Sequence, residues 1–225
     1  MPHCEQPQRP QKCFHVGYGQ SPRRSTWLEA TQECVDAPII VARRIKLAHQ
    51  IPVSRGHEIT IQAGPEIEHR VGIVAAGLEA RAAVIAVGEG AGEIDMVMAF
   101  GALRSEHAAV VAADIETVVC AVPGMPVKVI LETNALSDSE KTLACRIVCD
   151  AGSRFVKTTT GFHASGGATV ADVQLLRAAV GIALGVKAAG GIRSLTDARA
   201  MIGAGANRIG TSASAAILAA VEPSS

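Results

Sequence analysis

The chain has 225 residues, of which 48% are hydrophobic and 3% aromatic, and its 21 lysines and arginines balance 21 aspartates and glutamates. This length fits one large or two small domains, and α/β barrels of about this size fold as single domains. The zero net charge argues against a nucleic-acid protein with a basic surface, and no run of about 18 uncharged apolar residues predicts a membrane span. The cysteines are too sparse for a disulfide scaffold, and Cys145 and Cys149 alone do not make a zinc site.

The N-terminal third differs in character from the rest of the chain. Residues 1–70 hold seven of the ten prolines and five of the seven histidines. Residues 1–34 are predicted to be irregular, because proline and glycine interrupt any helical or strand periodicity of the apolar residues. They contain no apolar segment of the kind found in secretory signals, so we expect a cytoplasmic protein. Short strands are predicted at Ala37–Ile45 and Glu58–Ala63.

From about residue 75, short β-rich segments alternate with alanine-rich helical segments. Strands are predicted at Glu93–Ala99, Val127–Glu132, Arg154–Thr159, Gly185–Ala188 and Arg208–Gly210, and helices at Leu103–Val119, Ser137–Ala151, Thr169–Val180, Ser194–Ile202 and Ser212–Val221. A spacing of about 30 residues between strands is that of a βα unit with parallel strands. We therefore predict the α/β class and a single (β/α)8 TIM-barrel domain over residues 1–225. Residues 76–221 form its units 4–8, and residues 1–75 are atypical. A doubly wound sheet is the alternative.

Charged side chains interrupt four of these strands, although a buried parallel strand is normally almost continuously apolar. They are Asp95, Lys128, Lys157 and Lys187. One such residue alone is usually at a strand end and reaches solvent, but inward side chains of neighbouring barrel strands converge. A second ammonium nearby frees a lysine amine as a nucleophile that forms an imine with a carbonyl, and Asp95 is a candidate to pair with a lysine or move protons. The pattern predicts Schiff-base chemistry.

Glycine-rich turns follow the last two strands. Gly190 and Gly191 follow the strand of Lys187, and Gly210 and Ser212 follow the last strand. In α/β barrels, phosphate groups bind in the loops after strands seven and eight, on backbone N–H groups. The residues that follow Lys157 are Thr158, Thr159, Thr160 and Gly161. The threonines are expected either because they suit a β-strand or because their hydroxyls line a site for a polyol phosphate.

Five segments occur in a fixed order: Glu93–Val97, Val127–Thr133, Phe155–Phe162, Val186–Arg193 and Arg208–Ser212. Together they resemble the deoxyribose-phosphate aldolase family over about residues 78–220. The resemblance implies a lyase of the class I aldolase type on a (β/α)8 barrel. Such an enzyme cleaves 2-deoxy-D-ribose 5-phosphate to D-glyceraldehyde 3-phosphate and acetaldehyde, without a metal or cofactor, in deoxyribonucleotide catabolism.

The resemblance also implies roles for individual residues. Lys157 would be the Schiff-base lysine, Lys187 the second lysine that lowers its pKa, and Asp95 the proton-relay carboxylate. The residues expected around the substrate and its phosphate are Thr160, Gly161, Gly190, Gly191, Gly210 and Ser212. The expected partner is a small-molecule sugar phosphate rather than nucleic acid or membrane, and a homodimer is the candidate assembly.

The chain departs from the family pattern mainly in residues 1–75. The family opens with a strand like Asp-His-Thr-Leu-Leu-Lys, then one like Val-Cys-Val-Asn-Pro, then one that ends in Gly-Phe-Pro, and none of these occurs here. Smaller changes are Thr159, where the family prefers serine, and Ala213, where a second serine often helps to hold phosphate. One hypothesis is that residues 1–75 are an out-of-frame translation, and its rival is a divergent N-terminal third that still folds.

Three other functions stay open at this point. The first is another imine-forming, phosphate-binding barrel aldolase, which a panel of substrates distinguishes. The second is an inactive remnant of the aldolase or an interaction protein built on the barrel's C-terminal part, because a barrel without its first strands exposes two sheet edges. The third is a nucleic-acid or membrane module, which the missing basic patch disfavours.

Overall fold

In the computed structural model, residues 39–43, 48–53, 57–62, 66–70, 77–161 and 166–221 are described, with side chains from residue 79 onward. The predicted irregular segment 1–34 lies outside these residues. The elements in chain order are β1 (Ile39–Arg43), β2 (Ala48–Val53), β3 (His57–Gln62), β4 (Glu66–Arg70), α1 (Gly77–Gly88), β5 (Glu93–Val97), α2 (Phe100–Arg104), α3 (Ala108–Ala121), β6 (Val127–Ile130), the 3-10 turn η1 (Thr133–Ala135), α4 (Asp138–Asp150), β7 (Phe155–Lys157), α5 (Val170–Val180), β8 (Gly185–Ala189), α6 (Leu195–Gly203), β9 (Arg208–Gly210) and α7 (Ser214–Ala219).

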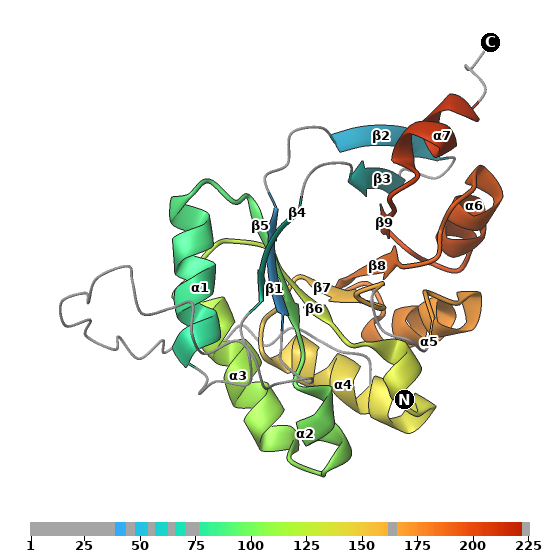
Figure 1. The fold of residues 1–225 in the computed structure, drawn as a ribbon. Helices are drawn as coiled ribbons and strands as arrows, with labels where there is room; N and C mark the ends of the chain where they lie inside the picture. The colour runs from blue at the N-terminus through green and yellow to red at the C-terminus, as the bar shows by residue number, and fades with distance from the viewer. Residues whose placement is uncertain are drawn as a thin grey trace.

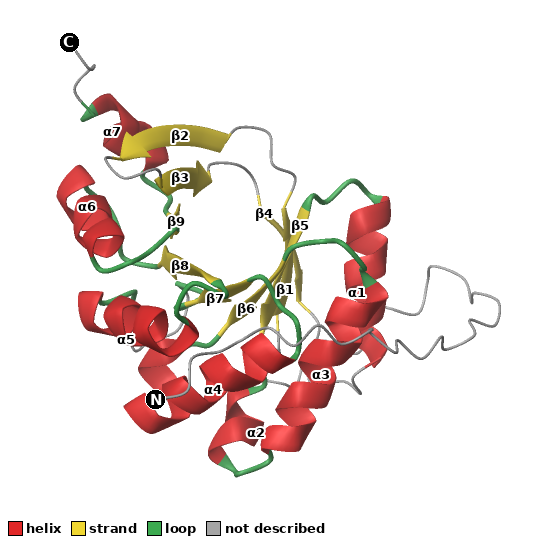
Figure 2. Ribbon diagram, turned by 180° about the vertical axis from the view of Figure 1, so that it is seen from behind, coloured by secondary structure: helices red, strands yellow, loops and turns green. Residues whose placement is uncertain are grey.

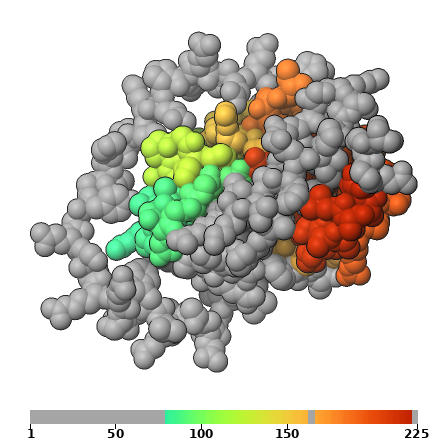
Figure 3. Space-filling model, turned by 90° about the horizontal axis from the view of Figure 1, so that it is seen from above, coloured from blue at the N-terminus to red at the C-terminus, as the bar shows by residue number. Residues whose placement is uncertain are grey.

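Strands β5 to β9 are all parallel and are hydrogen-bonded to one another in chain order. The strands curve into a ring and the helices lie outside it (Figures 1 and 2). The ring is open, because the hydrogen-bonded order β2-β3-β9-β8-β7-β6-β5-β1-β4 ends at β2 and β4. The space-filling view shows the α1–α3 segment in green on one side of the molecule and the α6–α7 segment in red and orange on the other (Figure 3). This is the arrangement of a TIM barrel, so the predicted α/β fold class is confirmed.

The strands before α1 depart from the regular barrel pattern. β1 is antiparallel to both β4 and β5, and β2 and β3 form an antiparallel pair, of which β3 lies parallel to β9. Only three residues join β2 to β3, whereas a parallel connection needs a dozen or more. The strands predicted at residues 37–45 and 58–63 are confirmed as β1 and β3. In the described part of residues 39–76 no helix separates these strands, and the barrel is distorted there.

The five C-terminal strands are found where they were predicted; β9 has the predicted bounds, and the ends of the others differ by at most two residues. The main correction concerns the helix predicted at Leu103–Val119, which is two helices, α2 and α3. The break lies at Glu106, whose φ of 64° is left-handed and cannot continue a helix. Helix α1 was not predicted, because apolar residues surround it almost evenly and leave no period to detect.

Side-chain caps fix where the helices that flank the site begin. Ser137 and Glu140 form a capping box at α4, and Ser194 and Asp197 form another at α6. Thr169 accepts a hydrogen bond at the start of α5. Each cap satisfies N–H groups that the helix itself leaves free, so the connections after β6, β7 and β8 end at defined positions.

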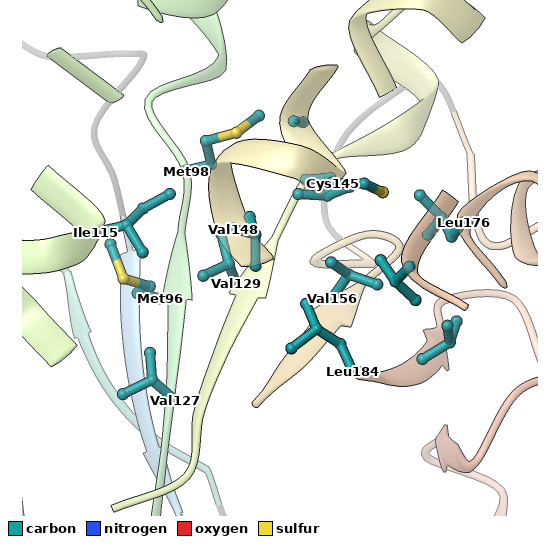
Figure 4. Close-up of a cluster of buried hydrophobic side chains, with 14 of the residues drawn as sticks. Met96, Met98, Ile115, Val127, Val129, Cys145, Val148, Val156, Leu176 and Leu184 are labelled. Carbon is teal, nitrogen blue, oxygen red and sulfur yellow. The ribbon is translucent and has the colours of Figure 1, made fainter. Parts of the chain in front are cut away.

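The hydrophobic core lies between the sheet and the helices. Met96, Val129 and Val156, on three neighbouring strands, are fully buried and face α3, α4 and α5 (Figure 4). Side chains alternate between the two faces of a strand, so residues one position away point into the ring. The residues that do so include Asp95, Lys128 and Lys157, and this alternation directs the strand charges toward one another.

A buried pair of carboxyl groups lies between α1 and α3. Glu79 and Asp114 are 1% and 9% exposed, and within the described residues no donor reaches either oxygen of Glu79. Two ionised carboxylates offer each other no donor, whereas a protonated Glu79 donates a hydrogen bond to Asp114. Burial, together with the charge of Asp114 and that hydrogen bond, raises the pKa of Glu79 from 4.5 to about 8. Burial also raises the pKa of Asp114.

This pair makes the protein less stable as the pH rises. Because the folded state binds the Glu79 proton more tightly than the unfolded state, its stabilising effect is complete below pH 4.5 and is lost between there and about pH 8. Glu79→Gln keeps the donor at every pH. We expect its melting temperature to exceed that of the unchanged protein at pH 8 and the difference to shrink at pH 5. Glu116→Gln, at an exposed position of α3, is the control. An equal pH dependence in all three proteins would contradict this account.

None of the described helices combines the length and the apolar character that a membrane-spanning helix needs.

Candidate functional site

The charged strand residues meet inside the ring. The strand register pairs Asp95 with Lys128, and Lys157 with Lys187. All four are buried, and Lys128 and Lys187 are among the largest fully buried side chains of the described chain. Burying a charge costs free energy unless the charge is paired, so these four buried side chains must contact one another directly.

Asp95 is the centre of this cluster. Its Oδ2 atom accepts hydrogen bonds from Lys157 Nζ at 3.1 Å and Lys187 Nζ at 2.8 Å. Its Oδ1 atom accepts one from Lys128 Nζ at 2.9 Å. The structure thus brings together the three residues predicted to be catalytic, because Lys157 and Lys187 both contact the carboxylate of Asp95.

The geometry suits a reactive amine. Lys157 and Lys187 share a single carboxylate oxygen, and two ammonium groups at that distance from one atom repel each other. Loss of a proton from one of them relieves the repulsion and leaves a neutral amine beside a carboxylate. Such an amine can attack a carbonyl, while the carboxylate can accept or return a proton.

The loops after β7 and β8 touch at glycine residues. Gly161 and Gly190 have φ angles of 84° and 91°, which favour glycine, and a Cβ at Gly161 would lie 3.5 Å from the Cα of Gly190. A Cβ at Gly190 would lie 2.6 Å from the Oγ1 of Thr159, too close for any side chain. Two of the predicted substrate residues are therefore side by side, and Gly191 follows them with a φ of 75°.

Two more of the predicted phosphate residues, Gly210 and Ser212, lie at the end of β9 and on the loop after it. A Cβ at Gly210 would lie 3.3 Å from Lys187 Cε, so glycine leaves room for the lysine. Thr211 Oγ1 donates to the carbonyl of Ile192 at 2.6 Å, which joins the loops after β8 and β9. Ser212 is exposed. The two loops predicted to hold phosphate are therefore neighbours.

The hydroxyl groups after Lys157 have different surroundings. Thr158 and Thr159 are buried and both donate to the carbonyl of Ala189 on β8, which suits a structural role. Thr160 is partly buried, and Glu132 Oε2 accepts hydrogen bonds from its Oγ1 at 2.7 Å and its N–H at 3.1 Å. Of the three threonines predicted as a hydroxyl lining, Thr160 is the one whose hydroxyl bonds to Glu132 and not to the backbone of β8.

Three residues of the site have no role in the sequence-based prediction. Lys128 was noted as a strand charge without one, while Glu93 and Arg208 were not considered. Lys128 Nζ lies 2.6 Å from Glu93 Oε2, and Arg208 forms an ion pair with the same carboxylate. Glu93 lies two positions before Asp95, so the period of a strand was the signal that could have found it.

Glu132 was missed for another reason. It follows β6 with a left-handed φ of 54°, is 2% exposed, and its Oε1 atom has no partner among the described residues. A left-handed conformation at a non-glycine residue costs energy and is typical of functional sites, but it leaves no mark in the sequence.

Within the side chains described, no group of three or more histidine, cysteine, aspartate or glutamate residues is placed to hold a metal ion.

No family model matches the chain. Among curated proteins, deoxyribose-phosphate aldolase of Streptococcus sanguinis is 55% identical over 139 residues, which are 62% of this chain and 63% of that protein. Deoxyribose-phosphate aldolase of Methanothermobacter thermautotrophicus is 45% identical over 180 residues, which are 80% of this chain and 78% of that protein. The match to the Streptococcus protein thus spans less than two thirds of its length.

The chain is also similar to solved structures of aldolases. The structure named "QR15, an Aldolase" has a TM-score of 0.62 and 38% identity, covering 64% of this chain and 65% of its own. A deoxyribose phosphate aldolase from Aeropyrum pernix, described as a unique tetramer, has a TM-score of 0.59 and 30% identity, covering 72% of this chain and 66% of its own.

Proposed function

The chain belongs to the deoxyribose-phosphate aldolase family, and from this premise we propose that it is a class I aldolase that cleaves 2-deoxy-D-ribose 5-phosphate. The observation that carries the proposal is the contact of Lys157 and Lys187 with one oxygen of Asp95. That arrangement supplies an amine nucleophile, a second charge that favours its neutral form, and a proton carrier. These are the groups that Schiff-base chemistry requires.

In the proposed reaction, the neutral amine of Lys157 attacks the aldehyde carbon of the open-chain sugar. Loss of water gives a protonated imine, which is an electron sink. Removal of the proton from the C3 hydroxyl then breaks the bond between C2 and C3, and its electron pair moves into the imine to give an enamine. D-Glyceraldehyde 3-phosphate leaves, C2 takes up a proton, and water releases acetaldehyde and regenerates Lys157. Asp95 is the proposed carrier of the protons, with Lys187.

The loop residues are proposed to bind the sugar phosphate. A side chain at Gly190 or Gly210 would crowd Thr159 or Lys187, so glycine at these positions keeps the loops close to the site lysines. The phosphate is proposed to bind the backbone of Gly190, Gly191 and Gly210. Thr160, Gly161 and Ser212 complete the proposed set. Backbone N–H groups of successive turn residues suit a phosphate because their partial positive charges converge on the anion.

The wider assignment follows the family. We propose one barrel domain over residues 1–225, with residues 76–221 as units 4–8, in a cytoplasmic enzyme of deoxyribonucleotide catabolism that needs no metal or cofactor. The proposed assembly is a homodimer. The proposed ligand is a small-molecule sugar phosphate rather than nucleic acid or a membrane.

A substrate panel tests the proposed function. The purified chain is incubated with 2-deoxyribose 5-phosphate, and acetaldehyde and glyceraldehyde 3-phosphate are measured as products. Ribose 5-phosphate and fructose 1,6-bisphosphate are tested beside it. We expect equal amounts of the two products from the deoxy sugar alone. Cleavage of another sugar phosphate in its place would identify a different imine-forming aldolase, and a folded protein that cleaves none would be an inactive remnant.

A further inference from the structure

A buried chain of ion pairs continues from Asp95 away from the two site lysines. Lys128 Nζ lies 2.9 Å from Asp95 Oδ1 and 2.6 Å from Glu93 Oε2. Arg208 on β9 donates to the other oxygen of Glu93, Oε1. A continuous path of opposite charges therefore runs from Arg208 through Glu93 and Lys128 to Asp95.

The strand positions place Glu93 and Arg208 on the far side of Asp95 from the substrate. Glu93 is the first residue of β5 and Arg208 the first residue of β9, whereas Asp95 and Gly210 come two residues later. In α/β barrels the substrate binds at the C-terminal ends of the strands. Among the described side chains, the path from Glu93 to the reacting groups runs through Lys128 and Asp95.

Lys128 determines how the carboxylate of Asp95 is shared. An ammonium has three donors, and fully buried Lys128 divides its donors between Asp95 and Glu93. While Glu93 holds one side of this ammonium, Lys128 engages Oδ1 of Asp95 and leaves Oδ2 to Lys157 and Lys187.

Glu93 is itself held firmly. The Arg208 guanidinium lies 4.5 Å from the centre of the Phe155 ring, and that ring occupies the space where a Cβ at Gly185 would lie. Burial alone would raise the pKa of Glu93, but hydrogen bonds and charges from Arg208 and Lys128 outweigh it and lower the pKa. Glu93 is thus an ionised, fixed carboxylate.

We propose that Glu93 is a positioning residue, which holds Lys128 on Oδ1 of Asp95 and so keeps Oδ2 facing Lys157 and Lys187. This inference rests on the proposed function. Among the described side chains, Glu93 contacts Lys128 and Arg208, Lys128 also contacts Asp95, and Asp95 contacts Lys157 and Lys187.

Loss of the Glu93 charge has two consequences in the same direction. Lys128 becomes free to take both oxygens of Asp95, and one negative charge near Lys157 disappears. Each favours the neutral amine of Lys157. The first also removes Asp95 from the position that proton transfer requires.

The test measures the protonation of the Lys157 amine in the absence of the sugar phosphate. The full chain is methylated with formaldehyde and cyanoborohydride between pH 6 and pH 10, and the modification of Lys157 is followed by mass spectrometry. In Glu93→Gln we expect the midpoint of the curve of Lys157 methylation against pH to move about one unit to lower pH. This is the low end of the pKa change that a nearby charge causes. We also expect kcat for cleavage to fall about tenfold or more, with little change in KM.

Matched variants separate a charge effect from a loss of structure. Arg208→Gln removes a positive charge and should move the midpoint to higher pH. In the double variant Glu93→Gln/Lys128→Met the two lost charges cancel, so the midpoint should return toward that of the unchanged protein. Glu116→Gln, on the surface, should leave it unchanged. If Glu93→Gln does not fold, Arg208→Gln carries the test.

The outcomes distinguish this inference from the proposed function. An unchanged midpoint in folded Glu93→Gln, or a shift that the double variant does not reverse, overturns the inference even if the protein cleaves the sugar phosphate. An unchanged or lower midpoint in Arg208→Gln does so too. The expected shifts in a protein without cleavage activity would support the positioning of Asp95 by Glu93 and Lys128 and reject the proposed function.

Discussion

Replacement of Lys157 by alanine is expected to abolish aldol cleavage. Lys128 and Lys187 also contact Asp95, but both are fully buried within β6 and β8, whereas Lys157 is the last residue of β7, at the end of the strand where substrates bind in α/β barrels. Loss of a nucleophile typically removes a factor of about 10⁵ or more from the rate, because the bond-forming step has no substitute. Product formation in a single turnover, with circular dichroism to confirm the fold, measures the effect.

The control for this variant is a lysine outside the ring. Lys141 on α4 pairs with Asp138 and Asp172 near the surface and contacts none of the site residues. Lys141→Ala should therefore keep most of the activity. Substantial cleavage by folded Lys157→Ala would show that the imine forms elsewhere, or that the reaction does not use an imine.

Replacement of Lys187 by leucine has the second largest expected effect. Leucine removes the ammonium but fills much of the same space, and Lys157 then has Asp95 Oδ2 without a competing cation. An opposite charge favours the protonated lysine, and each unit by which its pKa rises lowers the neutral fraction tenfold. We expect cleavage at pH 7 to fall about 10³-fold.

The pH dependence distinguishes this cause from simple damage to the site. Because the remaining Lys157 amine needs a higher pH to lose its proton, activity of Lys187→Leu should recover in part between pH 8 and pH 10. A pH–rate profile of both proteins measures this. Wild-type-like rates at pH 7 would remove Lys187 from the mechanism, and a flat loss at all pH values would assign it a structural role.

The charged residues within the strands allowed the site to be predicted, because burial makes them rare. Asp95, Lys157 and Lys187 stand in otherwise apolar strands, and the parallel order of those strands was enough to place them together. Glu93 and Arg208 were missed because each is the first residue of its strand. A charge at such a position ordinarily reaches solvent, so only the structure distinguishes a buried pair from an exposed one.

The pairing of the N-terminal strands was beyond prediction from pattern alone. β1 runs antiparallel to β5, and the β2–β3 pair lies beside β9, where a regular barrel has further parallel βα units. Short strands were predicted at residues 37–45 and 58–63, but the partner and direction of a strand depend on contacts distant in sequence. The gene's nucleotide sequence tests the out-of-frame hypothesis, which is wrong if neither other frame encodes the missing family motifs.

Borohydride trapping tests the central claim most directly. The soluble, folded protein is incubated with 2-deoxyribose 5-phosphate and reduced, and the modified peptide is identified by mass spectrometry, with Lys157→Ala as the control. We expect one adduct, on Lys157, which the control lacks. An adduct on another lysine, or none from folded protein, would contradict the assignment of Lys157 as the imine-forming residue.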